Sequence, residues 1–124
     1  MEQLILHLFG DYVTQTDWIA RNKIGSTRVV LIHSTIYSLP FLLLSPSLLA
    51  FSVIFVSHWL IDRYRLARFV IYAKNKLNDP GLQWADASKT GYPKDTPDWL
   101  AVWLFIIVDN TMHLMMNYAA LRWL

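Results

Sequence analysis

All four histidines of this chain lie inside apolar segments of the sequence, where ionisable side chains are costly and usually serve a function. Three of them have an aspartate four positions away: His7 with Asp11, His58 with Asp62, and Asp109 with His113. Positions four apart share one face of an α-helix. We therefore expect each pair to project from one helix towards a common interior, where His33 joins them from another helix.

Imidazole nitrogens and carboxylate oxygens are ligands that zinc and related divalent ions accept. The predicted metal ligands are His7, Asp11, His33, His58, Asp62, Asp109 and His113. This set exceeds the four ligands of a tetrahedral zinc, so it fits one ion or two ions that share bridging carboxylates. We expect zinc, with manganese or iron as alternatives, and Asp62 and Asp109 as the catalytic carboxylates. The alternative is that these residues form hydrogen-bonded pairs that only hold helices together.

Six further residues are predicted to support the site or to bind a substrate: Gln15, Tyr37, Asn117, Arg28, Arg63 and Arg65. The first three continue the ligand-bearing faces, where they would orient ligands or make ordinary interhelical hydrogen bonds. The arginines cluster near one membrane face. They would hold a phosphate or carboxylate of a substrate, or serve only to orient the chain in the membrane.

The elements that must position these residues are four apolar segments, each near or above the length of about 20 residues that crosses a bilayer. They span residues 2–22, 26–44, 47–76 and 96–124. The sequence thus predicts an all-α fold: a four-transmembrane-helix antiparallel bundle forming one integral membrane domain, residues 1–124. The third helix extends into the cytoplasm, and residues 77–95 form a cytoplasmic loop. The absence of cysteine excludes disulfides and thiolate metal sites.

The basic residues predict the orientation, because Lys and Arg concentrate on the cytoplasmic side of membrane proteins. Ten of the eleven fall on one side of the four segments: Arg21, Lys23, Arg28, Arg63, Arg65, Arg68, Lys74, Lys76, Lys89 and Lys94. Only Arg122 lies on the other side. We therefore expect both termini on the non-cytoplasmic side of a bacterial inner membrane. The first segment lacks the features of a removable signal peptide, so we expect it to be retained.

Several stretches resemble a known family. They are His7-Leu8-Phe9-Gly10-Asp11-Tyr12, Gln15-Thr16-Asp17-Trp18, Lys23, His58-Trp59-Leu60-Ile61-Asp62, Thr90-Gly91 and Asp109-Asn110-Thr111-Met112-His113. They are similar to the small bacterial and phage membrane proteins grouped as domain of unknown function 3307. The resemblance implies a short multi-helix membrane protein and carries no established activity. The scattered His and Asp also resemble, more loosely, bacterial inner-membrane metal-dependent hydrolases.

The leading hypothesis is a metal-dependent membrane hydrolase that uses an activated water on a lipid or an amphiphilic ester, amide or phosphoester. One alternative is an oligomeric conduit for protons or divalent ions, because intramembrane Asp and His residues also line such paths. Another is a non-catalytic phage or host accessory protein that binds a second membrane protein. The expected partners are membrane lipids, an anionic or lipid-like substrate and further copies of the chain, without nucleic acid.

Overall fold

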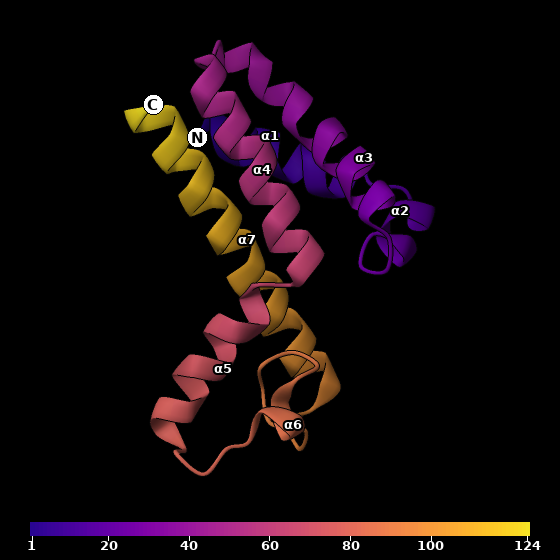
Figure 1. Cartoon of the computed structure of the whole chain (residues 1–124), viewed down its shortest axis with the longest axis vertical. Helices are drawn as coiled ribbons and strands as arrows, with labels where there is room; N and C mark the ends of the chain where they lie inside the picture. The colour runs from indigo at the N-terminus through magenta and orange to yellow at the C-terminus, as the bar shows by residue number, and fades with distance from the viewer. The chain divides into compact units, whose positions relative to one another are not determined.

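The computed structural model describes residues 1–124 and contains helices and turns but no strand, as the predicted all-α class requires. Figure 1 shows the course of the chain. In chain order the elements are α1 (Glu2–Leu8), the π-helix η1 (Phe9–Val13), α2 (Asp17–Asn22), α3 (Thr27–Ser38), the 3-10 helix η2 (Leu39–Leu44), α4 (Leu48–Tyr64), α5 (Ala67–Asn78), α6 (Trp84–Ala87) and α7 (Asp98–Trp123).

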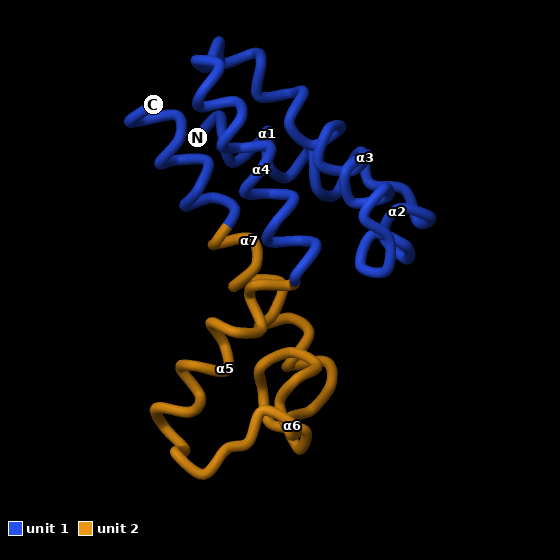
Figure 2. The backbone as a smooth tube through the Cα atoms, viewed as in Figure 1, with its two compact units in different colours: residues 1–64, 113–124 blue, residues 65–112 orange.

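The chain divides into two compact units, which share helix α7 (Figure 2). Unit 1 comprises Met1–Tyr64 and His113–Leu124, and unit 2 comprises Arg65–Met112. Unit 1 thus contains α1 to α4 and the end of α7, whereas unit 2 contains α5, α6 and the beginning of α7. The description of the whole chain as one integral membrane domain stays a prediction.

The first predicted segment is not one continuous helix. After α1 the backbone widens into the π-helix η1, and the helix ends at Thr14, whose hydroxyl donates to the Gly10 carbonyl oxygen at 2.8 Å. A new helix, α2, then starts at Thr16, whose hydroxyl accepts a hydrogen bond from the Ile19 amide at 3.3 Å. Hydroxyl side chains near a helix end compete in this way for backbone groups. The interruption divides residues 2–22 into three short pieces.

The third predicted segment is also divided. Helix α4 begins after Ser47, whose hydroxyl accepts from the Ala50 amide at 3.0 Å, and it ends at Tyr64. The next residue, Arg65, has a φ angle of 50°. This left-handed conformation cannot continue a right-handed helix, so the predicted extension becomes a separate helix, α5.

Two helical stretches are long and apolar enough to cross a membrane by length and composition: Thr27–Leu44, which joins α3 to η2, and α7 itself. They correspond to the second and fourth predicted segments. The first stretch starts after Ser26, whose hydroxyl accepts from the Val29 amide at 3.5 Å. It stops at Ser45, which adopts a left-handed conformation with a φ of 48°. The four-span bundle stays a prediction.

The apolar core of unit 1 lies where α3, η2, α4 and the end of α7 meet. It consists of Tyr37, Phe41, Ala50, Ile54 and Ala120, with Leu6, Leu44, Val53 and Leu121 packed against it. Because Tyr37 belongs to this core, its ring is held in place by packing, and its hydroxyl can act as a fixed point for neighbouring polar groups.

Gly10 of η1 packs directly against Tyr37. A Cβ atom at position 10 would lie 2.8 Å from Tyr37 Cδ2 and 3.0 Å from the Tyr37 carbonyl oxygen. Since the second contact is with backbone, it cannot be relieved by a side-chain rotation. We expect Gly10→Ala to lower the free energy of unfolding by about 1–3 kcal/mol, as overpacking does, measured by denaturant unfolding in detergent. Gly25→Ala is the control, because its Cβ would meet nothing closer than the Asn22 carbonyl at 4.0 Å. Equal stability of the two variants would contradict the close approach.

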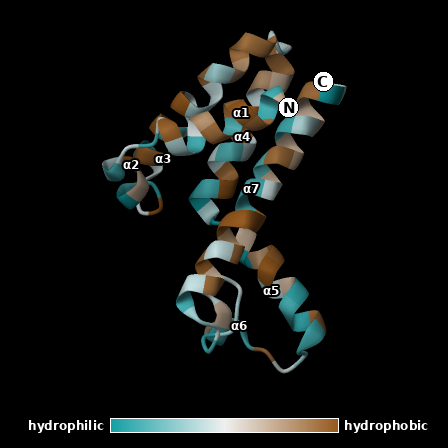
Figure 3. Ribbon diagram, turned by 180° about the vertical axis from the view of Figure 1, so that it is seen from behind, coloured by the Kyte–Doolittle hydropathy of each residue, from teal (hydrophilic) through white to brown (hydrophobic).

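Unit 2 contains the short helix α6, which interrupts the predicted loop 77–95. The Trp84 ring stacks on the Phe69 ring with centroids 5.1 Å apart, which joins α6 to α5. Lys94 donates a hydrogen bond to Asp86 at 2.6 Å, and this bond raises the pKa of the Lys94 ammonium. The later turns of α5 are hydrophilic (Figure 3), as expected for a helix end that projects from an apolar environment.

Candidate metal centre

Six of the seven predicted metal ligands come together inside unit 1. They are His7 on α1, Asp11 on η1, His33 on α3, His58 and Asp62 on α4, and His113 on α7, and all six are buried. Each pair four residues apart lies on one helical face, as the spacing requires. The structure therefore gathers ionisable groups from five separate elements at one place in the protein.

Four ligand atoms of this cluster lie close enough together to bind one cation, and we call them the four-atom group: His33 Nε2, His58 Nε2, Asp11 Oδ1 and Asp62 Oδ2. His33 Nε2 lies 3.1 Å from Asp11 Oδ1 and 3.4 Å from Asp62 Oδ2. His58 Nε2 lies 3.6 Å and 3.5 Å from the same two oxygens. Ligands about 2.0–2.1 Å from a tetrahedral zinc are separated by about 3.3–3.4 Å, so these four distances are close to the edges of such a site. One ligand atom from each residue also lies within 4.8 Å of all the others.

The His58 ring distinguishes this arrangement from a set of ordinary hydrogen bonds. The residue is fully buried, and neither ring nitrogen has a hydrogen-bond partner. The ring is fixed by stacking on Tyr37, with centroids 3.6 Å apart and planes at 16°. A buried imidazole that leaves both nitrogens unsatisfied is costly. A cation between Nε2 and the two carboxylates would satisfy one of the two nitrogens, so the residues present fit a divalent ion.

The remaining two histidines face the other oxygens of the same carboxylates. His113 Nε2 lies 3.3 Å from Asp62 Oδ1, and His7 Nδ1 lies 3.6 Å from Asp11 Oδ2. Each carboxylate therefore has one oxygen in the four-atom group, and its other oxygen lies next to a neighbouring imidazole. Such contacts orient a ligating carboxylate and fix which oxygen it presents to a metal.

Two of the predicted supporting residues are part of this network. The Tyr37 hydroxyl lies 2.9 Å from His7 Nδ1, and the Asn117 side-chain amide donates to the Tyr37 hydroxyl at 2.6 Å. Both residues are buried. They connect the histidine of α1 to α3 and α7, and they hold its ring in a defined orientation.

Lys23 is a member of the site that the ligand spacing did not identify. Its ammonium donates to Asp62 Oδ2 at 2.6 Å and lies 3.4 Å from His33 Nε2. By its type and position in the sequence, Lys23 belongs with the basic residues that orient the chain and with those that resemble the family. Because it contacts Asp62 across 39 positions of the chain, no local periodicity reveals the contact.

The remaining predicted residues are Asp109, Gln15 and the three arginines. Asp109 and Arg65 belong to unit 2: Asp109 lies on α7 one turn before His113, and the Arg65 guanidinium lies 5.0 Å above the Phe105 ring. Arg63 donates to the Thr27 hydroxyl and to the Ile24 carbonyl, so it fastens α4 to the turn before α3. Arg28 is exposed and Gln15 is half-buried. The substrate-binding role of the arginines stays a prediction.

The family model described as "Protein of unknown function (DUF3307)" matches residues 1–122. No curated protein and no solved structure matches the chain.

Proposed function

We propose a function from the site itself, because the chain belongs to the DUF3307 family, whose description assigns no activity. The protein is proposed to bind one divalent cation through Asp11, His33, His58 and Asp62. Two imidazoles and two carboxylates suit zinc, and manganese or iron are the alternatives. A second ion with Asp109 among its ligands stays a prediction from the sequence.

The observation that supports this proposal is the set of four nitrogen–oxygen distances of 3.1–3.6 Å around a buried centre. The two carboxylates offset the two positive charges of a divalent cation, and the Lys23 ammonium beside Asp62 adds one further positive charge. Hydrogen-bonded pairing alone leaves both ring nitrogens of His58 without a hydrogen bond.

We place this centre in a membrane. The two long apolar stretches, Thr27–Leu44 and α7, support spanning segments. In the proposed arrangement the predicted segments 2–22 and 47–76 complete a four-span antiparallel bundle in the bacterial inner membrane, with both termini on the non-cytoplasmic side. The uneven distribution of the basic residues supports this orientation.

The reaction we propose is hydrolysis of a lipid or an amphiphilic ester, amide or phosphoester. A bound divalent ion would supply a water whose pKa is lowered towards 7. Asp62 is one of the predicted catalytic carboxylates, and a role in proton transfer is supported by the distance of 3.3 Å between its Oδ1 and His113 Nε2. His113 would then receive the proton from Asp62 or stabilise its charge. Asp109 keeps its predicted catalytic role.

A second candidate function, a conduit for protons or divalent ions, is favoured by one observation. A chain of polar contacts runs through unit 1 in the order Lys23, His33, Asp11, His7, Tyr37 and Asn117, with successive distances of 3.4, 3.1, 3.6, 2.9 and 2.6 Å. Ionisable and hydroxyl groups in such a series transfer protons in membrane proteins. Metal retention separates the two functions, because a hydrolase keeps its ion and a conduit releases it.

The test is elemental analysis of protein purified in detergent and passed through metal-free buffer. We expect about one zinc per chain, with nitrogen and oxygen ligands at about 2.0–2.1 Å by X-ray absorption. Removing the ion with a chelator should lower the thermal unfolding temperature, because a ligand that binds only the folded state stabilises it. Protein that carries no metal after purification and takes up none from zinc-containing buffer would refute the proposal.

A further inference from the structure

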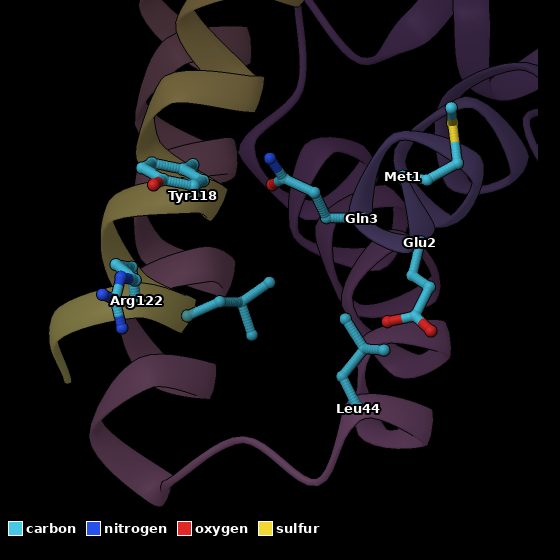
Figure 4. Close-up of a pocket in the computed structure, with 7 residues that line it drawn as sticks. Met1, Glu2, Gln3, Leu44, Tyr118 and Arg122 are labelled. Atoms are coloured by element: carbon cyan, nitrogen blue, oxygen red, sulfur yellow. The ribbon is translucent and has the colours of Figure 1, made fainter.

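The end of unit 1 that holds both termini contains a pocket of about 390 Å³. It is lined by Met1, Glu2, Gln3, Leu44, Tyr118, Leu121 and Arg122. Figure 4 shows Tyr118 and Arg122 of α7 along one wall and Glu2, Gln3 and Leu44 along the other. The volume is within the range of small-molecule sites, which is about 300–1,000 Å³.

The pocket combines apolar walls with two opposite charges. Arg122 is the one basic residue of the chain that departs from the predicted cytoplasmic side. Glu2 of α1 lines the opposite wall (Figure 4), and neither residue forms an ion pair within the protein. Both side chains are exposed, so both charges remain accessible to a ligand. Leu44 and Leu121 supply the apolar surface.

We infer that this pocket binds the headgroup of a phospholipid of the ethanolamine type. The Arg122 guanidinium matches a phosphate, to which it can donate two hydrogen bonds. The Glu2 carboxylate accepts a hydrogen bond from the primary ammonium, and the first part of an acyl chain packs against Leu44 and Leu121. A choline headgroup fits less well, because its quaternary ammonium has no N–H to donate to Glu2.

The site does not depend on the metal centre. Glu2 and Arg122 do not belong to the His and Asp cluster, and no residue of that cluster lines the pocket. The lipid site can therefore be tested whether or not the protein binds metal, and failure of one proposal leaves the other standing.

The experiment uses the full chain in detergent and measures binding of dioctanoyl phosphatidylethanolamine by native mass spectrometry. Dioctanoyl phosphatidylcholine and inorganic phosphate are measured in parallel. We expect saturable binding of the ethanolamine lipid, roughly tenfold tighter than the choline lipid, since a charge-assisted hydrogen bond is lost in the latter. Arg122→Gln and Glu2→Gln should each weaken binding of the ethanolamine lipid by roughly tenfold.

The control is Arg21→Gln, because Arg21 is equally basic but exposed on α2 and paired with Asp17 at 2.8 Å. It should leave lipid binding unchanged. Since Arg122 is exposed, its replacement should not alter folding, which circular dichroism verifies. Equal affinity for the two lipids, or wild-type binding by Arg122→Gln, would overturn the inference. Inorganic phosphate competing as strongly as the lipid would also overturn it and would identify a free-phosphate site.

Discussion

Replacing Asp62 with asparagine is expected to reduce bound zinc from about one ion per chain to less than a tenth of that amount. Asp62 Oδ2 lies 3.4 Å from His33 Nε2 and 3.5 Å from His58 Nε2. The change therefore alters one ligand of the four-atom group and removes one of the group's two negative charges. Loss of a residue that merely orients a ligand costs about 10–100-fold in metal affinity, and loss of a ligand should cost more. Elemental analysis and zinc titration measure both effects.

Asp17→Asn is the matched control, because it removes the same charge from an aspartate whose side chain is 77% exposed and paired with Arg21. It should bind zinc like the wild type. His58→Ala provides a second test that keeps both carboxylates, and it should also lose the metal. If Asp62→Asn folds and binds zinc with wild-type affinity, the cluster serves only to join helices.

Replacing Lys23 with methionine is expected to produce two effects of opposite sign. In metal-free protein, the Asp62 carboxylate loses the ammonium that lies 2.6 Å from it, and breaking a largely buried ion pair costs about 3–5 kcal/mol of stability. In the presence of zinc, the same change removes a positive charge next to two ligand atoms. We therefore expect zinc affinity to rise by about tenfold or more. Unfolding with and without zinc, together with zinc titration, measures the two effects.

Lys94→Met is the control for Lys23. Lys94 forms an ion pair with Asp86 at the same distance of 2.6 Å, but its side chain is 78% exposed. Exposed ion pairs contribute little to stability, so this variant should remain close to wild type in stability and in zinc affinity. A Lys23→Met protein with unchanged zinc affinity would show that its ammonium does not compete with the cation.

Much of the candidate site could be predicted because helical spacing determines which side chains share a face. His7 with Asp11 and His58 with Asp62 are both four positions apart, and both pairs meet in the buried cluster. His33 was expected to join them because it is an ionisable residue within an apolar segment. Spacing within a helix does not determine how neighbouring helices are aligned. Helical spacing therefore could not predict that His33 and His58, and not His7 and His113, belong to the four-atom group.

The fold departs from prediction where local backbone conformation overrides apolar composition. The first segment is apolar enough to be read as a single helix, but the hydroxyls of Thr14 and Thr16 end one helix and start another. Arg65, with its φ of 50°, ends α4 for a similar local reason. Lys23 was not assigned to the site because its contact with Asp62 depends on tertiary structure alone.

The order of the ligands along the chain has a consequence for biosynthesis. All atoms of the four-atom group come from residues 11–62, in the first half of the 124-residue sequence. The ribosome therefore delivers the full ligand set before α7, which begins at Asp98, has been synthesised. His113 and Asn117 arrive last and close around groups that are already present. Cation capture by the nascent chain would thus precede completion of the fold, since early segments assemble before later ones.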